Sequence, residues 1–351
     1  MKKGKILVTG GTGYIGSHTV VELDAAGYEV VIVDNFSNSS PDVLDGLEII
    51  TGKKITFLEL DCANPEHMKL LFEKHPDIDA AIHFAAYKSV GESVDKPLEY
   101  YKNNIDSLIN VLTNITKGGR NGSVVFSSSC TVYGQPTPEH LPVSESAPLQ
   151  PAASPYGRTK QICEDILNDS VKASEGILKV ISLRYFNPIG AHPSAMIGEL
   201  PRGVPNYLLP FVTQAAIGIR ESVCVFGDDY NTPDGSCIRD YIYVCDLAKA
   251  HVKAVERILE KQGEMDGSIE YFNLGTGKGL SVLEVINQFM KATGINVPYK
   301  IVGRRAGDIE QVWADPSKAN KILGWSADTP LDVVFKSAWE WEKRISRHSF
   351  S

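Results

Sequence analysis

The N-terminal stretch constrains the fold more than any other part of the sequence. A short aliphatic run, Ile6-Leu7-Val8, is followed by the loop 9–16 and then by a helical pattern that ends at Gly27. Within the loop, glycine recurs at positions 10, 13 and 16. In a strand–loop–helix unit such glycines permit a tight turn, let the backbone approach a pyrophosphate and let the helix pack closely on the strand. The order of strand, loop and helix therefore predicts a dinucleotide-binding unit rather than a glycine-rich turn.

The second strand of this unit carries a feature that distinguishes between dinucleotides. The run 29–33 is typical of a buried strand, and Asp34 ends it at a position eighteen residues after Gly16. A carboxylate near this offset binds the adenosine ribose and repels a 2′-phosphate. No arginine follows Asp34 directly. The sequence therefore favours NAD over NADP, with the phosphates at the N-terminus of the first helix.

Further strands alternate with helical patterns through the first half of the chain. Aliphatic runs lie at 55–60, 79–84, 123–126 and 180–183, and helical stretches such as 97–117 separate them. This alternation predicts an α/β fold with a Rossmann-type, doubly wound parallel sheet. With the first two strands, six strands complete the predicted sheet. Ligands of such a sheet bind at the carboxyl ends of its strands.

The second half of the chain has shorter and more varied elements. Beyond position 187 we predict a helix near 208–217, strands at 223–226 and 271–274, a helix at 246–260 with Asp246 as N-cap, and a helix at 281–293 with Ser281 and Glu284 as a capping box. We expect an NAD-binding domain formed by residues 1–186 and about 238–262. A smaller C-terminal substrate-binding lobe would then comprise residues 187–237 and 263–351.

Composition argues against several classes of partner. The 351 residues carry a formal net charge of −8 and no long basic run, which disfavours nucleic acid or an anionic membrane. No apolar stretch approaches the length of a transmembrane helix. The six cysteines form no CxxC pair and have no metal-ligand spacing with histidine. We therefore expect free thiols, no metal site and a cytoplasmic protein.

Two further patterns suggest chemistry. Tyr156 and Lys160 are four residues apart, so on a helix both side chains share one face. An ammonium beside a phenol lowers the phenol pKa from about 10, which favours proton transfer near neutral pH. A surface pair has the same spacing. The triplet Ser127-Ser128-Ser129 follows a predicted strand, where ligands bind, although a serine-rich turn would also fit.

Taken together, these features resemble the extended short-chain dehydrogenase/reductases. Within them the chain is most similar to the UDP-glucose 4-epimerase (UDP-galactose 4-epimerase) family, from Val8 to about Trp341. The runs that carry the resemblance are 8–19, Gly91-Glu92-Ser93-Val94, 96–101, Thr131-Val132-Tyr133-Gly134, 183–188 and Arg239-Asp240-Tyr241. They are far more specific than a single glycine motif.

The resemblance implies an activity and roles for three catalytic residues. UDP-glucose and UDP-galactose would interconvert by transient oxidation at C4 and return of the hydride to the opposite face, in galactose metabolism and the supply of UDP-sugars for glycans. Tyr156 would take the 4-hydroxyl proton, Ser129 would hydrogen-bond O4, and Lys160 would bind the nicotinamide ribose. The related 4,6-dehydratases carry an Asp-Glu pair after the serines, whereas this chain has Cys130-Thr131. A dehydratase is therefore disfavoured.

The same resemblance implies the binding residues. NAD contacts correspond to Gly10, Gly13, Tyr14, Ile15, Gly16, Asp34, Asn35, Asn38, Asp61, Cys62, Phe84, Lys88, Asn103, Tyr156, Lys160 and Tyr185. Substrate contacts correspond to Ser129, Tyr156, Asn187, Asn206, Tyr207, Cys224, Phe226, Arg239, Tyr241, Arg305, Asp308 and Val312. Core packing is an alternative role for Ile15 and Phe84, and surface solvation for the two arginines.

Two positions depart from the family pattern. The family usually has asparagine where this chain has Tyr207, which keeps a hydroxyl donor for that ligand contact but is much bulkier. Val312 stands where relatives carry tyrosine or a smaller residue beside C2 of the sugar. Because valine leaves more room than tyrosine, we expect UDP-N-acetylglucosamine and UDP-N-acetylgalactosamine to be accepted as well.

The sequence is compatible with more than one oligomeric state and with two functions other than the interconversion of UDP-glucose and UDP-galactose. Helices 97–117 and 155–173 have wide apolar faces, which in the family pair two subunits into a homodimer; burial within one subunit is the alternative. The activity could also be restricted to N-acetylated or uronic UDP-sugars. A non-catalytic NAD-binding sensor is the alternative from a different functional class.

Overall fold

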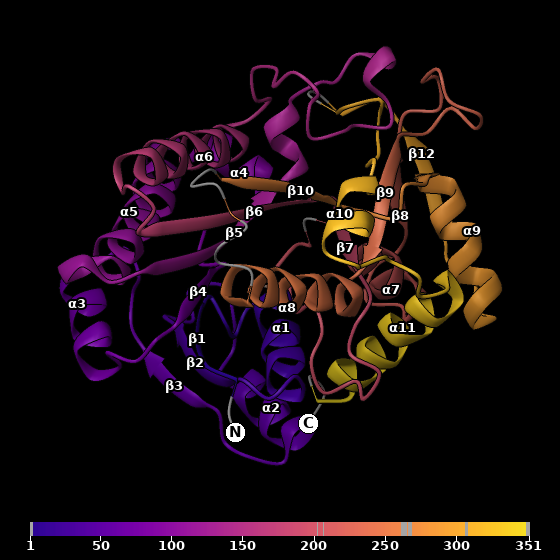
Figure 1. Cartoon of the computed structure of the whole chain (residues 1–351). Coiled ribbons are helices and arrows are strands. Elements are labelled where there is room, and N and C mark those ends of the chain that lie inside the picture. The colour runs from indigo at the N-terminus through magenta and orange to yellow at the C-terminus, as the bar shows by residue number, and fades with distance from the viewer. Residues whose placement is uncertain are drawn as a thin grey trace.

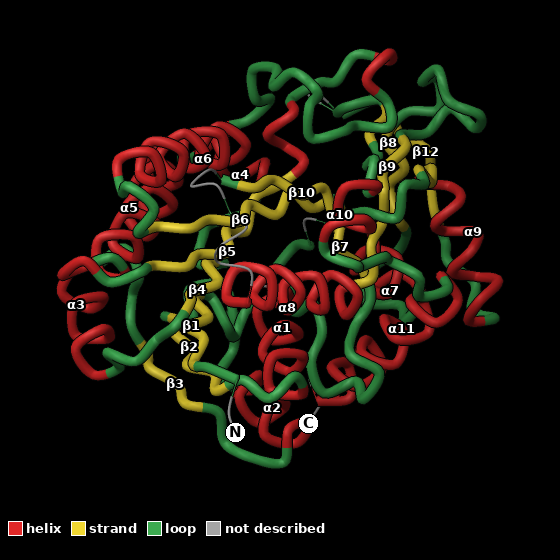
Figure 2. Tube along the Cα trace, in the orientation of Figure 1, coloured by secondary structure: helices red, strands yellow, loops and turns green. Residues whose placement is uncertain are grey.

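A seven-stranded, fully parallel sheet forms the centre of the computed structural model (Figures 1 and 2), which describes residues 3–201, 203–205, 207–260, 265, 269–305 and 308–348. The strand order is β10-β6-β5-β4-β1-β2-β3. The bounds are β1 Lys5–Thr9, β2 Glu29–Asp34, β3 Thr56–Glu59, β4 Ala80–His83, β5 Gly122–Ser129, β6 Leu178–Tyr185 and β10 Glu270–Leu274. The α/β doubly wound prediction is confirmed.

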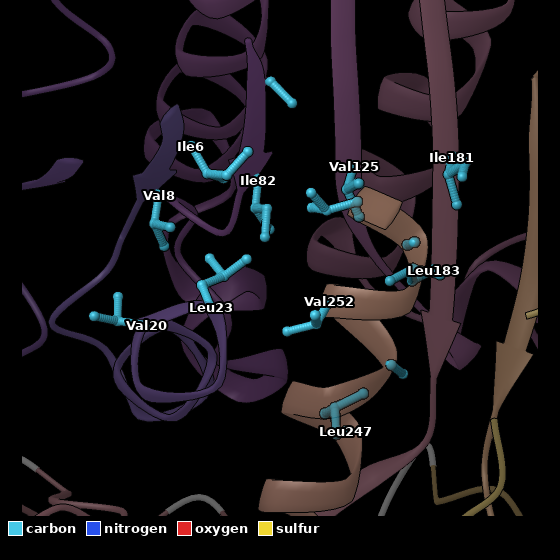
Figure 3. Packing of buried hydrophobic residues seen from close by; sticks show 14 of the residues in the cluster. Ile6, Val8, Val20, Leu23, Ile82, Val125, Ile181, Leu183, Leu247 and Val252 are labelled. Atoms are coloured by element: carbon cyan, nitrogen blue, oxygen red, sulfur yellow. The ribbon is translucent and has the colours of Figure 1, made fainter. Parts of the chain in front are cut away.

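Helices cover both faces of this sheet, which explains why the central strands β1, β2 and β4 are almost continuously aliphatic. One face carries α1 (Tyr14–Ala25), α2 (Asp42–Thr51) and α8 (Val244–Glu260). Figure 3 shows Ile6 and Val8 of β1 on this side, together with Leu23 of α1 and Val252 of α8. The other face carries α3 (Pro65–Lys74), α5 (Pro97–Ile115) and α6 (Pro155–Ala173), and the short helix α4 (Val90–Asp95) precedes α5.

The glycine-rich loop lies between β1 and α1 and has the tight geometry that the sequence predicts. Gly10 has a positive φ of 68°, and a Cβ there would lie 2.9 Å from the backbone nitrogen of Ala85. A Cβ on Gly16 would overlap the carbonyl oxygen of Gly10. Glycine at these positions therefore lets α1 begin directly above the end of β1.

Among the described residues of the second half, two small sheets and three helices form a smaller lobe, and a fourth helix, at 317–322, packs on β10 of the large sheet. In one sheet β9 (Ile238–Tyr243) pairs with β7 (Asn187–Ile189), β11 (Gly279–Ser281) and β13 (Gln311–Val312); in the other, β8 (Val223–Phe226) pairs with β12 (Tyr299–Val302). The helices are α7 (Leu208–Ala216), α9 (Val282–Thr293), α10 (Ser317–Ile322) and α11 (Leu331–His348). Phe289 and Phe335 pack at the centre of the lobe. The predicted capping box of Ser281 and Glu284 is present at α9.

Three details of the second half differ from the sequence expectation. β10 is a seventh strand of the large sheet and pairs with β6. β9 belongs to a small sheet, so that only α8 from the range 238–262 covers the large one. α8 begins at Val244, and Asp246 does not cap it but accepts hydrogen bonds from the backbone and hydroxyl of Thr329. A local sequence pattern can identify a strand or a polar residue near a helix start. Which strand it pairs with, or which group it binds, depends on the tertiary structure.

Two negative findings concern only the residues with described coordinates. Among them, no helix has the length and apolarity needed to cross a membrane. In that same part of the chain no group of three or more histidine, cysteine, aspartate or glutamate side chains is arranged to hold a metal ion.

Candidate active site

The proposed catalytic tyrosine and serine meet where β5 ends and α6 begins. Ser129 is the last residue of β5, and its side chain lies close enough to Tyr156, in the first turn of α6, to oppose the rise that burial causes in the pKa of the phenol. Ser154 caps this helix by accepting the backbone N–H of Gly157 at 3.1 Å, and Pro155 occupies the first helical position. The three serines are therefore part of a strand and not of a turn.

Lys160 lies one turn further along α6 and is almost completely buried. Its Nζ donates a hydrogen bond of 2.6 Å to the carbonyl oxygen of Ser127, and lies 5.9 Å from the ring centroid of Tyr156. The ring of Phe126 is closer, at 4.8 Å. The predicted sharing of one helical face is thus confirmed, and the ammonium also links α6 to β5.

The electrostatics of the pair differ from the sequence expectation. Burial raises the pKa of Tyr156 well above its ordinary value, and the hydrogen bond from Ser129 opposes that shift. Burial lowers the pKa of Lys160 to about 8. The expected lowering of the tyrosine pKa by Lys160 is not present in this structure, because the ammonium is directed at the Ser127 carbonyl and desolvation dominates.

The proposed dinucleotide contacts lie along the carboxyl ends of the strands. Asp34, at the end of β2, accepts hydrogen bonds from the backbone of Thr12 (3.2 Å) and of Phe36 (2.9 Å), so its carboxylate faces the glycine-rich loop. Asp61 and Cys62 follow β3, Phe84 follows β4, and Tyr185 ends β6, where its hydroxyl bonds to that of Ser127. Asn35 and Asn38 are exposed beyond β2. Asn103 of α5 donates to Asn104 at 3.0 Å.

Lys88 is surrounded by groups from three parts of the chain. Its Nζ lies 5.9 Å from the ring centroid of Tyr14, 5.0 Å from that of Tyr207 and 3.9 Å from a carboxylate oxygen of Glu199. Tyr14 also donates its hydroxyl to the carbonyl of Gly190 at 2.6 Å. This cluster joins the glycine-rich loop to the segment that leads into α7.

The dinucleotide fit rests on the shape of this edge. The glycines leave the loop without side chains, and only the carbonyl of Gly10 lies within 4 Å of a Cβ built on Gly13. The N–H groups of Gly10 and Gly13 themselves donate to the carbonyls of Val33 and Gly10, which holds the turn tight. The N-terminus of α1 follows at Tyr14, while the carboxylate of Asp34 lies beside the loop. These residues suit a pyrophosphate and an adenosine ribose.

Four of the proposed substrate residues come together on one small sheet. β9 places Tyr241 beside Asn187 of β7, and Arg239 beside Val312 of β13. Val312 is only 4% exposed and packs in an apolar cluster with Val132. This cluster lies near the carboxyl ends of β5 and β6; we call this end of the sheet, where Ser129 and Tyr156 lie, the catalytic edge. The Arg239 charge opposes the burial that raises the pKa of Cys130 to about 11, which places the guanidinium near the residue that follows Ser129.

The remaining substrate residues form a second group around β8. Arg305 pairs with Asp308 at 2.6 Å, and its guanidinium lies 5.3 Å from the ring centroid of Phe226. Cys224 lies on the same strand as Phe226. Asn206 lies outside the described residues. Tyr207 lies in neither group, since it packs on Lys88, and its proximity contributes to the raised pKa of Tyr156.

Sequence reasoning missed several buried polar residues around this edge. Asp240 is fully buried and accepts four hydrogen bonds, from the backbone and hydroxyl of Thr276 and from the backbone of Gly277 and Ala314. Glu164 and Arg184 form a buried ion pair beneath Ser128. Asp240 and Arg184 lie in runs that carry the family resemblance, and all three residues lie inside apolar runs, where a charged side chain requires a partner.

The family comparison agrees with this geometry. Residues 7–338 match the family model described as GDP-mannose 4,6 dehydratase. The chain is 50% identical over 338 residues to the UDP-glucose 4-epimerase of Dictyostelium discoideum, covering 96% of this chain and 95% of that protein. The Bacillus subtilis (strain 168) UDP-glucose 4-epimerase is 49% identical over 337 residues, with 96% of each chain covered.

A solved structure supports the same assignment. The UDP-glucose-4-epimerase of Stenotrophomonas maltophila, crystallised with bound NAD and formylated UDP-arabinopyranose, superposes with a TM-score of 0.92. It is 46% identical, and the match covers 98% of this chain and 99% of that one. On this similarity in sequence and structure, the chain belongs to the UDP-glucose 4-epimerase family of the extended short-chain dehydrogenase/reductases.

Proposed function

We propose that this protein interconverts UDP-glucose and UDP-galactose with NAD as its cofactor, in galactose metabolism and the supply of UDP-sugars for glycans. The observation that carries the proposal is the placement of Ser129 beside Tyr156, close enough to oppose the rise that burial causes in the pKa of the phenol, with Lys160 one turn away, at the strand edge that also holds the glycine-rich loop. A proton-transfer group and a dinucleotide cradle therefore share one edge of the sheet.

The roles of the residues follow from their contacts. NAD, when bound, supplies a reversible hydride acceptor and a positive ring. Tyr156 removes the proton from the sugar 4-hydroxyl and later returns it, and Ser129 holds the same oxygen through its hydroxyl. Lys160 places a buried cation one turn below the phenol, where it favours the phenolate once its ammonium reaches the ribose and the tyrosine. Asp34 and the loop glycines position the adenosine half.

The substrate is held unevenly in this proposal. Arg239 and Arg305 bind the diphosphate of UDP, since a guanidinium makes charge-assisted, bidentate bonds to phosphate. Asn187, Tyr241, Cys224, Phe226 and Asp308 complete the UDP site. The hexose has fewer contacts, which allows it to present either face of C4 to the cofactor. The proposed domains are residues 1–186 with about 238–262, and 187–237 with 263–351, except that β10 belongs to the large sheet of the first domain and β9 to a small sheet of the second.

A dehydratase and a sensor are less well supported. The family model carries a dehydratase description, but Cys130 and Thr131 follow Ser129, so no carboxylate stands there for water elimination. A non-catalytic sensor would not need the intact set of Ser129, Tyr156 and Lys160.

A direct assay tests the proposal. Purified protein given UDP-glucose, with no added NAD, should produce UDP-galactose and no net NADH, as measured by chromatography and absorbance. Tyr156→Phe should lower kcat by about 10²- to 10⁴-fold, the usual contribution of a general acid–base group, with little change in Tm. Wild-type activity in Tyr156→Phe, or stoichiometric NADH release, would contradict the proposed reaction.

The sugar range depends on Val312. Because this side chain is smaller than tyrosine, we infer that UDP-N-acetylglucosamine and UDP-N-acetylgalactosamine are also substrates. Val312→Tyr should lower the turnover of UDP-N-acetylglucosamine relative to that of UDP-glucose. Since Val312 is packed in an apolar cluster, Tm must be measured alongside, with Val312→Cys as a small-residue control. An unchanged ratio in a folded Val312→Tyr variant would rule out this role.

The proposed location is the cytoplasm. All six cysteines are free thiols, and four of them are buried. Free thiols are typical of a reducing compartment. Fractionation of the native cells with a tagged protein tests this, and recovery from an oxidising compartment would contradict it.

A further inference from the structure

Ser128 lies between two residues of the catalytic edge but faces the other side of the sheet. In β5, Val124 and Phe126 pack in the cluster that includes Leu167 of α6, and Val125 packs in the opposite cluster. Because side chains alternate along a strand, Ser128 continues the series directed at α6. Its hydroxyl donates a 2.7 Å hydrogen bond to the Glu164 carboxylate.

Glu164 is 3% exposed, and all its described partners lie beneath the catalytic edge. Its Oε1 also accepts the hydroxyl of Ser182 at 2.9 Å. The guanidinium of Arg184 donates to both carboxylate oxygens, through Nε at 3.0 Å and Nη2 at 2.7 Å. Arg184 is 4% exposed and pairs with Ser128 in the β5–β6 register. The positive charge of the Arg184 guanidinium thus compensates the carboxylate charge of Glu164 inside the protein.

The surroundings of Arg184 fix its orientation. Its Cζ lies 4.3 Å from the ring centroid of Tyr271 and 5.1 Å from that of Tyr133. Nη1 donates to the hydroxyl of Tyr133 at 3.1 Å, and that hydroxyl donates to Asn273 of β10 at 2.7 Å. The ion pair therefore connects α6 with β5, β6 and β10.

These contacts attach α6 to β5 at three successive turns. Tyr156 lies beside Ser129, Lys160 donates to the Ser127 carbonyl, and Glu164 accepts from Ser128. The three helix residues are spaced four apart and so share one face. Of these three attachments, only the third involves none of the proposed catalytic residues Tyr156, Ser129 and Lys160.

The desolvation free energy of this buried ion pair suggests that it serves to position α6 rather than to stabilise the fold. Two buried charges lose their hydration, and apolar residues of similar volume can often hold the same elements at least as stably. We propose that Glu164, oriented by Arg184, is a positioning residue that sets α6 against β5, so that Tyr156 stays within hydrogen-bonding distance of Ser129. The inference rests on the proposed function, because it assigns a purpose to that distance.

Two variants test this positioning role. Ser128→Ala removes one hydroxyl and leaves the ion pair, whereas Glu164→Gln removes the charge with little change in shape. Each should lower kcat at least ten-fold while KM for UDP-glucose stays within two-fold, because the UDP contacts lie on other elements. In Glu164→Gln the alkaline limb of the kcat profile should also move to lower pH. Burial lowers the pKa of Lys160, and the side chains of Cys163 and Glu164 on the same helix oppose this shift; His83 of β4 also interacts electrostatically with the ammonium.

A matched ion pair provides the control. Arg257 of α8 and Glu270 of β10 form a bidentate pair at 2.6 Å. Glu270 is the first residue of β10, so this pair lies at the amino ends of the parallel strands, away from the catalytic edge. Glu270→Gln should lower Tm but keep kcat within two-fold of wild type. If Glu164→Gln fails to fold, Ser128→Ala still decides the question.

The outcomes separate the two proposals. An active wild type, an inactive Tyr156→Phe, and unchanged kcat in folded Ser128→Ala and Glu164→Gln would overturn the positioning role alone. A wild type without epimerase activity, or an active Tyr156→Phe, would overturn the proposed function and this inference with it. A loss of kcat equal to that of Glu270→Gln would mean that the pair is merely structural.

Discussion

At the scale of single residues, burial decides the charge states around the catalytic edge. Tyr156 and Lys160 are both shifted toward their neutral forms, the tyrosine by a raised pKa and the lysine by a pKa lowered to about 8. Buried histidines follow the same rule. His251, whose ring lies 4.7 Å from that of Phe84 and 5.8 Å from that of Tyr185, has a pKa lowered to about 4 by desolvation.

His251 leads to a prediction for acid stability. Its folded-state pKa lies below the unfolded value of about 6.5, so the unfolded chain binds the proton first and stability falls as the pH drops from 6.5 toward 4. The contribution is on the order of 1 kcal/mol per pH unit in that window. His251→Gln should therefore give a flatter dependence of Tm on pH between 4 and 6.5. Parallel curves for the two proteins would show that His251 does not contribute to acid lability.

At the scale of elements, close approach of backbone segments gives the glycine-rich loop its specificity. Helix α1 can begin directly above β1 because Gly16 has no side chain to meet the Gly10 carbonyl. Helix α6 begins equally close to β5, with Ser154 as its cap and Tyr156 in its first turn. In both cases a strand end and a helix start provide the site, as is general for doubly wound sheets.

Gly16→Ala tests this close approach. The new Cβ would overlap the Gly10 carbonyl and lie 2.9 Å from the Cα of Gly11, so α1 must shift. Overpacking of this kind costs about 1–3 kcal/mol and exceeds the gain of about 1 kcal/mol from replacing a helical glycine. We expect a lower Tm and less NAD in the purified protein, measured by absorbance after denaturation. Gly91→Ala, at a helical glycine of α4 with open space around its Cβ, should change neither; equal effects of the two substitutions would contradict the explanation.

At the scale of the whole molecule, several apolar side chains remain exposed on one flank, around the exposed ion pair of Lys102 and Asp106 on α5. Leu98 is 81% exposed and Ile109 42% exposed on α5, and Val94 and Leu149 are exposed nearby on α4 and on the loop before α6. Leu98 and Ile109 are three helical turns apart and share a face. A pocket of about 650 Å³, lined by Tyr101, Arg158 and Asp165 among others, lies between α5 and the start of α6. Apolar faces of this kind support the proposed homodimer through α5 and α6.

The dimer is tested by substitutions on this flank. Wild type should sediment as a dimer at micromolar concentration, and Leu98→Glu combined with Ile109→Glu should sediment as a monomer, because two charges would be buried in the interface. Ile49→Glu, at a position 59% exposed on α2, which lies away from α5 and α6 in Figure 1, should leave the dimer intact. A monomeric wild type would contradict the proposal.

The sequence by itself determined the local geometry and, through its resemblance to a family, the chemistry. Glycine spacing at 10, 13 and 16 predicted the loop, and the Ser281–Glu284 capping box was present as expected. Such features depend on backbone angles and side chains within one or two turns, so they can be read from neighbouring residues.

Only the tertiary structure decided which distant groups meet. It placed β10 beside β6, directed Lys160 at the Ser127 carbonyl, and paired Glu164 with Arg184 beneath Ser128. The balance between desolvation and pairing also reversed the expected direction of the Tyr156 pKa. These outcomes depend on burial between segments that are far apart in the chain, which neither periodicity nor motif spacing encodes.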